Sequence, residues 1–383
     1  MRRVYSQRIY LPPLASSLIT GNSDHSGNSC NMLAWIFHRV HRLPGRFITT
    51  YCYASGLLIL LRGDIDALCR LSGNNRRMKT DSLERPPLTP KYWAGWLGVS
   101  LFWLIGKLPQ KLCLALSVPL AWLMARLLKR RRAIAVRNVE RCFPELDANQ
   151  QKAIVDDCFR SLARAVFEIA WSWSASRRRI LKIGEVEGLD NLLEARKQGR
   201  GVLLITAHIS CLEIGGRILA QSLPDAKGMY RPLKSPVLEW YQAQARAKYP
   251  TDMISKRDMR SAIRYLCDGG VLWYAPDQDF GSDQSVFVPF FGIQTATLLA
   301  THRLIRMTGC AVVPMFPSYD PETRRYTVSL LPPIEDFPGD DPVPDLEKLN
   351  KIMEDQIRCA PGQYWWVHRR FKTRPEGESP FYD

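Results

Sequence analysis

The chain has 383 residues, of which 46% are apolar, 23% charged and 10% aromatic, enough for one large domain or two with a substantial core. Its mean hydropathy of −0.18 excludes a multi-span membrane protein, and its apolar content excludes a disordered chain or a collagen-like repeat. A formal net charge of +16 indicates an anionic partner, which is nucleic acid, an acidic protein, a phosphorylated substrate or an anionic lipid.

The ten cysteines are scattered along the chain without a single CxxC motif. A disulfide framework or a zinc ribbon is therefore not expected, and a reducing compartment is favoured. The chain has no HExxH motif, and His208, His302 and His368 are the only histidines outside the N-terminal segment. We therefore expect no metal site.

Residues 1–77 differ in composition from the rest of the chain. They contain ten Arg and no Lys, a Gly/Ser/Asn-rich tract at 21–31, and an apolar run at 52–61 that is too short to cross ~30 Å of hydrocarbon. A mitochondrial-type presequence is an alternative, but two early prolines and the Gly/Ser/Asn tract interrupt an amphipathic helix. We expect residues 1–77 to be a disordered or non-native N-terminal extension, with the working protein beginning at Met78.

Two apolar, Trp-rich runs follow at 92–105 and 112–128, and the basic block 129–132 closes the second. Each run is shorter than the ~20 residues of a typical transmembrane helix, so two buried helices are one interpretation. The tryptophans and the basic block favour the other, a tilted or broken membrane helix whose basic flank stays in the cytoplasm. We therefore predict a membrane-anchor segment at 78–132.

From residue 133 to the end, short strands alternate with helices. Strands are expected at 202–206, 227–230, 271–274, 311–316 and 326–330, and helices at 147–173, 189–197, 213–221, 237–248, 259–267 and 297–307. This alternation predicts an α/β domain at 133–383, with a mixed sheet flanked by helices. Functional residues of such folds gather beyond the strand ends.

The first of these strands runs directly into an HxxxxE arrangement, His208 to Glu213. In one continuous helix the two side chains would lie ~140° apart, so they meet only if a turn separates them. Glu213 would then hold the imidazole tautomer while the other ring nitrogen removes a proton from a hydroxyl. A hydrogen-bonded structural histidine explains the spacing equally well. Cys211 is a weaker candidate nucleophile, because a small buried thiol is the commoner role.

Further candidates follow the next strands. Arg231 comes directly after the second strand, where its guanidinium suits a phosphate or a developing oxyanion. Asp277 and Asp279 follow the third strand and are candidates to bind a cation or to orient Arg231. The apolar segment 287–292 is a candidate stiff loop lining an acyl channel. The alternative for Arg231 is a surface salt bridge, and for Asp277 and Asp279 it is a turn that satisfies its own backbone hydrogen bonds. For the segment 287–292 it is core packing.

The tract at 365–374 interleaves aromatic side chains with the cations Arg369, Arg370, Lys372 and Arg374. Such a tract stacks on nucleic-acid bases or lies against phosphorylated lipid headgroups. Because no nucleic-acid-binding module is recognisable, we expect lipid headgroups rather than nucleic acid as the partner. A solvated basic tail is the alternative.

Several of these motifs occur together and in a fixed order: His208 to Glu213, Tyr230-Arg231-Pro232, Trp273 to Asp279, Phe287-Val288-Pro289 and His368 to Gly377. Across residues 85–378 this pattern resembles the lipid A biosynthesis lauroyl acyltransferase family, the Kdo-dependent late acyltransferases of lipopolysaccharide synthesis. Residues 1–77 have no counterpart in that family.

The resemblance implies a Gram-negative acyltransferase with a glycerolipid-acyltransferase-like fold, single-pass or monotopic in the cell inner membrane, with its catalytic domain facing the cytoplasm. The donor would be a fatty acyl chain on acyl carrier protein, with laurate favoured over myristate or palmitoleate. The acceptor would be the hydroxyl of a 3-hydroxyacyl chain on a Kdo-bearing lipid A precursor.

In that reaction His208 is the general base and Glu213 supports it. Arg231 or backbone N–H groups near the turn stabilise the oxyanion, and no metal or redox cofactor is needed. Two other functions remain as alternatives. One is a glycerophospholipid acyltransferase, and the other is a noncatalytic basic protein that binds membranes or nucleic acid.

Overall fold

The computed structural model describes residues 84–197, 199–247 and 253–382. The expected N-terminal extension at 1–77 and its proposed start at Met78 lie outside these residues.

The described strands form a central sheet and a separate hairpin. The sheet contains β1 (Gly184–Glu187), β2 (Val202–Ile205), β3 (Lys227–Tyr230), β4 (Met253–Ser255), β5 (Val271–Tyr274), β8 (Ala311–Asp320) and β9 (Arg325–Leu330). Their order across the sheet is β1-β9-β8-β2-β5-β3-β4. Only the β8–β9 pair is antiparallel among these described pairs, so the sheet is mixed, as predicted.

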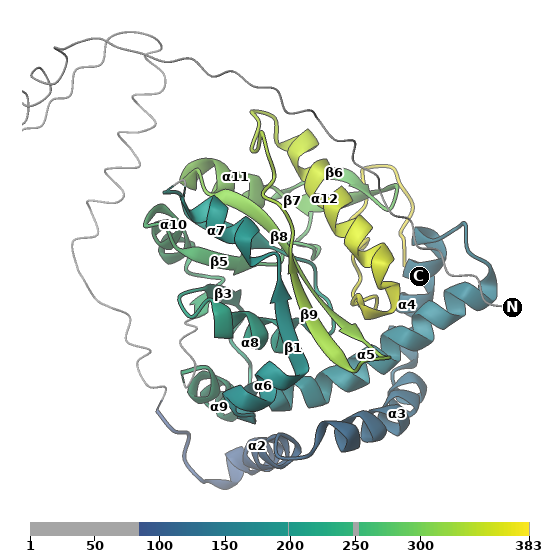
Figure 1. Cartoon of the computed structure of the whole chain (residues 1–383). Coiled ribbons are helices and arrows are strands. Elements are labelled where there is room, and N and C mark those ends of the chain that lie inside the picture. The colour runs from purple at the N-terminus through teal and green to yellow at the C-terminus, as the bar shows by residue number, and fades with distance from the viewer. Residues whose placement is uncertain (1–83, 198, 248–252, 383) are drawn as a thin grey trace, which may run out of the picture. The chain divides into compact units, whose positions relative to one another are not determined.

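Helices lie on both sides of this sheet (Figure 1). They are α2 (Trp93–Ile105), α3 (Gln110–Leu127), α4 (Lys129–Cys142), α5 (Ala148–Ser174), α6 (Arg177–Ile183), α7 (Leu189–Lys197), α8 (Leu212–Ser222), α9 (Pro236–Ala247), α10 (Met259–Cys267), α11 (Leu299–Thr308) and α12 (Pro342–Cys359). Two short 3-10 turns, η1 (Pro90–Tyr92) and η2 (Pro361–Gln363), complete the described elements. The predicted α/β class with a sheet flanked by helices is therefore confirmed.

Helix α5 begins at the capping box that the sequence predicts. The side chain of Asp147 accepts hydrogen bonds from the backbone N–H groups of Asn149 and Gln150, and the Gln150 side chain accepts one from the Asp147 N–H. These bonds satisfy N–H groups that the start of a helix leaves without partners. The helix packs against α3 on one side and α8 on the other, so it joins the apolar N-terminal helices to the sheet domain.

The centre of the sheet positions the site. All four residues of β2 are buried, because β2 lies between β5 and β8 and is parallel to both. The register pairs Val202 with Val271 and Ile205 with Tyr274, so β2 and β5 end level with each other. The residues that follow these two strands therefore meet at one edge of the sheet.

The segment 287–292 is not the loop that we expect from its sequence. Strand β6 (Ser285–Phe290) pairs antiparallel with β7 (Ile293–Leu298), and Phe291 and Gly292 form the turn, both with positive φ. Val288 and Phe290 are fully buried. Val288 and Phe290 therefore belong to the core, and the expected loop is corrected to a β-hairpin, whereas a wall of an acyl channel stays a prediction.

Helices α2 and α3 replace the single anchor helix that the sequence suggests, and α3 contains Pro119. Among the described helices, α3 alone is long and apolar enough to cross a membrane by length and composition. Most large apolar side chains of the two helices are exposed: Trp93, Leu97, Leu101, Trp103, Leu104, Leu112, Leu116, Val118, Trp122, Leu123 and Leu127. We call this set the α2–α3 apolar surface. It contradicts the interpretation of two buried helices.

Candidate active site

His208 and Asp277 form a hydrogen-bonded pair at the edge of the sheet, each three residues beyond the end of its strand, β2 or β5. The imidazole Nδ1 lies 2.5 Å from Oδ1 of Asp277, and the backbone N–H of His208 donates to Oδ2 over 2.9 Å. Both carboxylate oxygens therefore hold the same residue. This two-point contact fixes the orientation of the imidazole.

The environment of the pair sets its protonation. Asp277 is buried, whereas the His208 side chain keeps 22% of its surface exposed. Burial by itself lowers the pKa of His208, but the charge of Asp277 and its hydrogen bond outweigh burial, so the pKa of the imidazole lies above its ordinary value. Burial also raises the pKa of Asp277, and His208 more than reverses this, so the carboxyl pKa lies well below its usual range.

Gln278 contacts the other nitrogen of the same ring. Its side-chain Nε2 lies 3.1 Å from Nε2 of His208. With the Nδ1 proton directed at Asp277, the neutral imidazole carries its lone pair on Nε2, where the amide of Gln278 can donate. Sequence reasoning missed this residue, although it stands directly beside Asp277 in the chain.

The C-terminal segment completes the surroundings of His208. The backbone N–H of Trp365 donates to the His208 carbonyl over 3.0 Å, and that of Ser210 donates to the Gln363 carbonyl over 2.8 Å. The rings of Trp365 and His208 have centroids 5.8 Å apart. Residues far along the chain therefore hold the turn between β2 and α8.

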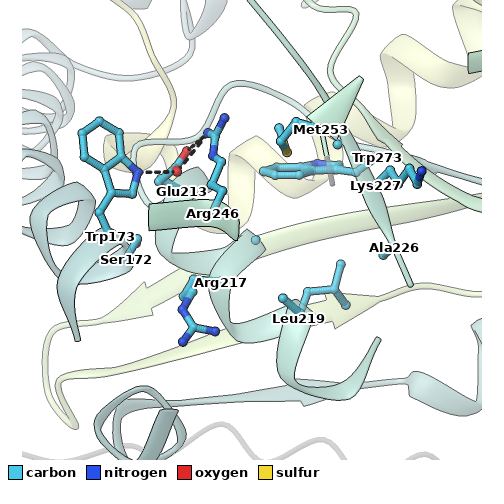
Figure 2. A pocket seen from close by; sticks show the side chains of 13 residues that line it. Ser172, Trp173, Glu213, Arg217, Leu219, Ala226, Lys227, Arg246, Met253 and Trp273 are labelled. Atoms are coloured by element: carbon cyan, nitrogen blue, oxygen red, sulfur yellow. Dashed lines mark hydrogen bonds and ion pairs between the residues drawn. The ribbon is translucent and has the colours of Figure 1, made fainter. Parts of the chain in front are cut away.

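The expectation that Glu213 braces His208 is wrong. Glu213 lies in the first turn of α8 and accepts hydrogen bonds from Trp173 Nε1 at 2.8 Å and from Arg246 at 2.9 Å to both oxygens (Figure 2). The physical reason is that the carboxylate is directed toward α5 and α9, whereas Asp277 follows the strand next to β2. Asp277 therefore stands in the position beside the imidazole that we expected for Glu213.

Glu213 instead lines a narrow apolar pocket between α5, α8, α9 and β5, with a cavity volume of about 50 Å³. Figure 2 shows Trp273 and Met253 on one side of it and the Glu213–Arg246 pair on the other. Gly216 keeps it open, because a Cβ there would lie 2.7 Å from the Trp273 ring. The pocket and the His208 turn share α8, which begins four residues after His208.

Among the described residues, two other candidates make no hydrogen bond or ion pair with His208 or Asp277. Arg231 is exposed after β3 and makes no hydrogen bond or ion pair with another described residue. Asp279 is buried and accepts from the backbone N–H and the hydroxyl of Thr373, at 2.7 and 2.8 Å, and from Gly281 N at 3.0 Å. Its carboxylate holds the C-terminal segment, so the expectation that it orients Arg231 is corrected.

Arg370 is not available to bind a headgroup. It is 2% exposed, and its guanidinium donates to the carbonyl of Ala296 over 2.6 Å and to the hydroxyl of Thr297 over 3.1 Å. An arginine that binds a headgroup must reach solvent, so this assignment is corrected to a structural contact with β7.

The other cations of the tract differ from one another. Arg374 donates to the carbonyl of Gln294 over 2.7 Å and forms an ion pair with Glu378. Lys372 is exposed. Arg369 lines a groove beside α4. Only Lys372 and Arg369 therefore keep the accessibility that the headgroup hypothesis requires.

One chemical alternative, a cysteine nucleophile, loses support. Cys211 is fully buried, and burial raises the pKa of its thiol far above the ordinary value, so the thiolate needed for attack is not formed. Within residues 84–382 as far as they are described, His, Cys, Asp and Glu side chains form no group of three suited to a metal ion.

Comparison with known proteins identifies the family. The model of the bacterial lipid A biosynthesis acyltransferase family matches residues 83–373. A lipid A biosynthesis lauroyltransferase from Escherichia coli is 39% identical over 76% of this chain and 95% of its own. The palmitoleoyltransferase of that organism is 38% identical over 77% and 96%, and its myristoyltransferase is 30% identical over 76% and 90%.

A crystal structure of a 1-acyl-sn-glycerophosphate acyltransferase from Thermotoga maritima is 15% identical and covers 66% of this chain and 99% of its own, with a TM-score of 0.32. The glycerolipid-acyltransferase-like fold therefore stays a prediction. The family match and the relatives, each covered over nine tenths or more of its length, establish that this chain belongs to the bacterial lipid A biosynthesis acyltransferase family and is an acyltransferase.

Proposed function

We propose that this acyltransferase moves a fatty acyl chain, with laurate preferred, from acyl carrier protein to the hydroxyl of a 3-hydroxyacyl chain on a Kdo-bearing lipid A precursor. The observation that carries the chemistry is the His208–Asp277 pair at the sheet edge, with Nδ1 and Oδ1 2.5 Å apart. The donor and acceptor follow from the family and its relatives, which are named for lipid A biosynthesis.

His208 acts as the general base in this proposal. A secondary hydroxyl is barely ionised at neutral pH, so a base must take its proton as the oxygen attacks the thioester carbon. Nε2 is the nitrogen for this step, because Nδ1 is directed at Asp277. Asp277 holds the tautomer and stabilises the imidazolium that forms, and the imidazolium then protonates the departing thiolate.

Negative charge grows on the thioester oxygen during attack. The amino terminus of α8 begins four residues after His208, and its N–H groups carry the positive end of the helix dipole. We place the oxyanion there, with Arg231 as the second donor if its exposed side chain turns inward when substrate binds. Loss of one such donor commonly costs ~3 kcal/mol of transition-state stabilisation.

The narrow pocket beside Glu213 is our candidate site for the acyl chain of the donor. Its walls are mainly apolar, and α8 leads from it to His208. Its volume of about 50 Å³ is well below the roughly 300–1,000 Å³ typical of ligand sites. The chain therefore enters only as Trp273 and Met253 rotate, and the Glu213–Arg246 ion pair holds α8 and α9 together while they do.

We further propose that the α2–α3 apolar surface lies in the cytoplasmic leaflet of the inner membrane without crossing it. Helix α3 packs along α5. A spanning α3 would carry the charged side chains of α5, such as Lys152 and Arg160, toward the bilayer centre. Lys107 over the Trp103 ring and Arg126 over the Trp122 ring match the cation and aromatic pairs of a membrane interface.

The test uses purified full-length enzyme with acyl carrier proteins bearing laurate, myristate and palmitoleate. The Kdo-bearing precursor is offered in one reaction and lysophosphatidate in another, and mass spectrometry identifies the products. We expect a laurate added to the first acceptor and a loss of roughly 10²- to 10⁴-fold in turnover in His208→Ala. Transfer only to lysophosphatidate would make the enzyme a glycerophospholipid acyltransferase. Full turnover in His208→Ala would exclude His208 as the base.

A further inference from the structure

A basic groove lies between α4 and the C-terminal segment. Its cavity volume is about 530 Å³, and its cationic walls are Lys129, Arg130, Arg132, Arg137 and Arg369. Glu140 is the one carboxylate among its described lining residues. We call it the α4 groove. Its balance of charge suits an anionic ligand.

Three of these cations keep their charge available. Arg132 is paired with Asp156 at 3.1 Å, but Lys129, Arg130 and Arg369 have no carboxylate partner among the residues that the structure describes. Arg369 stacks on the ring of Tyr382, with its Cζ 5.1 Å from the centroid. This stacking fixes the guanidinium in the wall of the groove without neutralising it.

The groove borders the α2–α3 apolar surface. Helix α3 ends at Leu127 and α4 begins at Lys129, so the chain passes from one to the other within two residues. Leu127 is 71% exposed and Leu128 is 42% exposed beside the first cation of the groove. A bilayer that receives these leucines brings its phosphate layer to the level of Lys129 and Arg130.

The wall of the groove is also tied to the catalytic segment. The side-chain amide of Asn138, on α4, donates to the carbonyls of Trp366 and His368 over 2.7 and 2.9 Å. The preceding residue, Trp365, is the one whose N–H contacts the His208 carbonyl. The groove is therefore held at a fixed position relative to the active site.

We propose that the α4 groove binds the headgroup phosphate of an anionic phospholipid of the bilayer and so sets the orientation of the enzyme on the membrane. This inference rests on the membrane attachment that is part of the proposed function. A membrane phospholipid is the occupant that the site favours over an acidic protein, because the groove adjoins the exposed leucines at the end of α3, which the acyl chains of a bilayer would cover while the groove holds a phosphate. Each bound phosphate gains charge-assisted hydrogen bonds from Arg130 and Arg369.

The test measures flotation of the full-length protein with vesicles of phosphatidylcholine, with and without phosphatidylglycerol. The variant Lys129→Gln/Arg130→Gln/Arg369→Gln removes the three available charges. The matched control, Arg260→Gln/Arg303→Gln/Lys348→Gln, removes three exposed charges from α10, α11 and α12. Thermal unfolding followed by circular dichroism checks that both variants fold.

We expect the wild type to prefer vesicles that contain phosphatidylglycerol. The groove variant should lose about a hundredfold in that affinity, roughly fivefold per charge, and bind pure phosphatidylcholine as the wild type does. The control variant should stay within about twofold of the wild type. Equal losses in both variants would mean that the vesicle attracts the protein's overall positive charge rather than the groove, and would overturn the proposal. Loss of binding of the groove variant to pure phosphatidylcholine would also overturn it.

Two further measurements identify the occupant. The groove variant should bind acyl carrier protein, and the Kdo-bearing precursor in neutral detergent micelles, as tightly as the wild type does. Weakened binding of the carrier protein would make the groove a protein-docking surface, and weakened binding of the precursor would make it an acceptor site. Either result overturns the proposal. Because no arm measures acyl transfer, failure of the proposed reaction would leave the vesicle result standing.

Discussion

The two ring nitrogens of His208 have different partners, and this division sets how the enzyme should respond to pH. His208 can act as the proposed base only when its ring is neutral, and Asp277 holds the pKa of His208 above its ordinary value of about 6.5. Turnover should therefore rise with pH and level off only above that value. The measurement is kcat/KM against pH with a saturating acceptor.

Asp277→Asn tests the cause of that shift. Without the carboxylate charge the pKa of His208 falls, so the acid limb of the profile should move to lower pH. The maximal rate should nevertheless fall by ~10³- to 10⁴-fold, because the amide does not hold the tautomer or stabilise the imidazolium. A profile whose acid limb does not move would mean that another group controls it.

Gln278 offers a second test of the same site. Gln278→Ala removes the amide that donates to the Nε2 lone pair of the neutral imidazole, so the pKa of His208 should rise and the acid limb should move slightly to higher pH, while kcat/KM at high pH should not fall. Gln278→Glu places a carboxylate at the same nitrogen, which favours the charged imidazole, so the acid limb should move to higher pH. An unshifted limb in Gln278→Glu would place this side chain away from His208 in the working enzyme.

The Glu213–Arg246 pair joins the start of α8 to α9. Glu213→Gln leaves the guanidinium of Arg246, which is largely buried, without its charged partner. We expect the free energy of unfolding to fall by about 1–3 kcal/mol in a denaturant titration. The acid limb of the activity profile should stay where it is in the wild type. A shift like that of Asp277→Asn would restore Glu213 as the partner of His208.

Periodicity and turn chemistry predicted only part of the elements, because α12, the β6–β7 hairpin and strands β1 and β4 were not expected from the sequence. The helix at Leu189–Lys197 and the strand at Lys227–Tyr230 agree with the structure at both ends. Local pattern could not predict the partner of His208, because that partner depends on β5 lying next to β2 in the sheet order. Asp277 was singled out in the sequence, but only the parallel register brings it to the imidazole.

The same limit explains the errors at 287–292 and at Arg370. The apolar run 287–292 has no polar residue to mark where β6 ends and the turn begins, and that turn places Phe291 at positive φ, which few sequences signal. In the sequence, nothing distinguishes Arg370 from the other cations of the basic tract. Its burial depends on the carbonyl of Ala296, a partner from a distant strand.

For the whole molecule, the α2–α3 apolar surface should decide where the enzyme resides. Leu97→Glu/Leu116→Glu replaces two exposed leucines, one on each helix, so stability should change little while partition onto phosphatidylcholine vesicles falls at least tenfold. The control Leu193→Glu/Met307→Glu places the same charges on exposed positions of α7 and α11. Equal loss in the two variants, measured by flotation, would assign membrane binding to another surface.

The hydrogen bonds from Ser210 to Gln363 and from Trp365 to His208 join the middle of the chain to its last fifth. When the ribosome has synthesised the chain through Asp277, His208 and its carboxylate partner are present. The C-terminal segment that holds the turn, with Gln363 and Trp365, is not yet made. Activity should therefore appear only at the very end of synthesis. A nascent chain, or one shortened at its C-terminus, therefore lacks the hydrogen bonds that hold the turn carrying His208, although its α2–α3 apolar surface is already made.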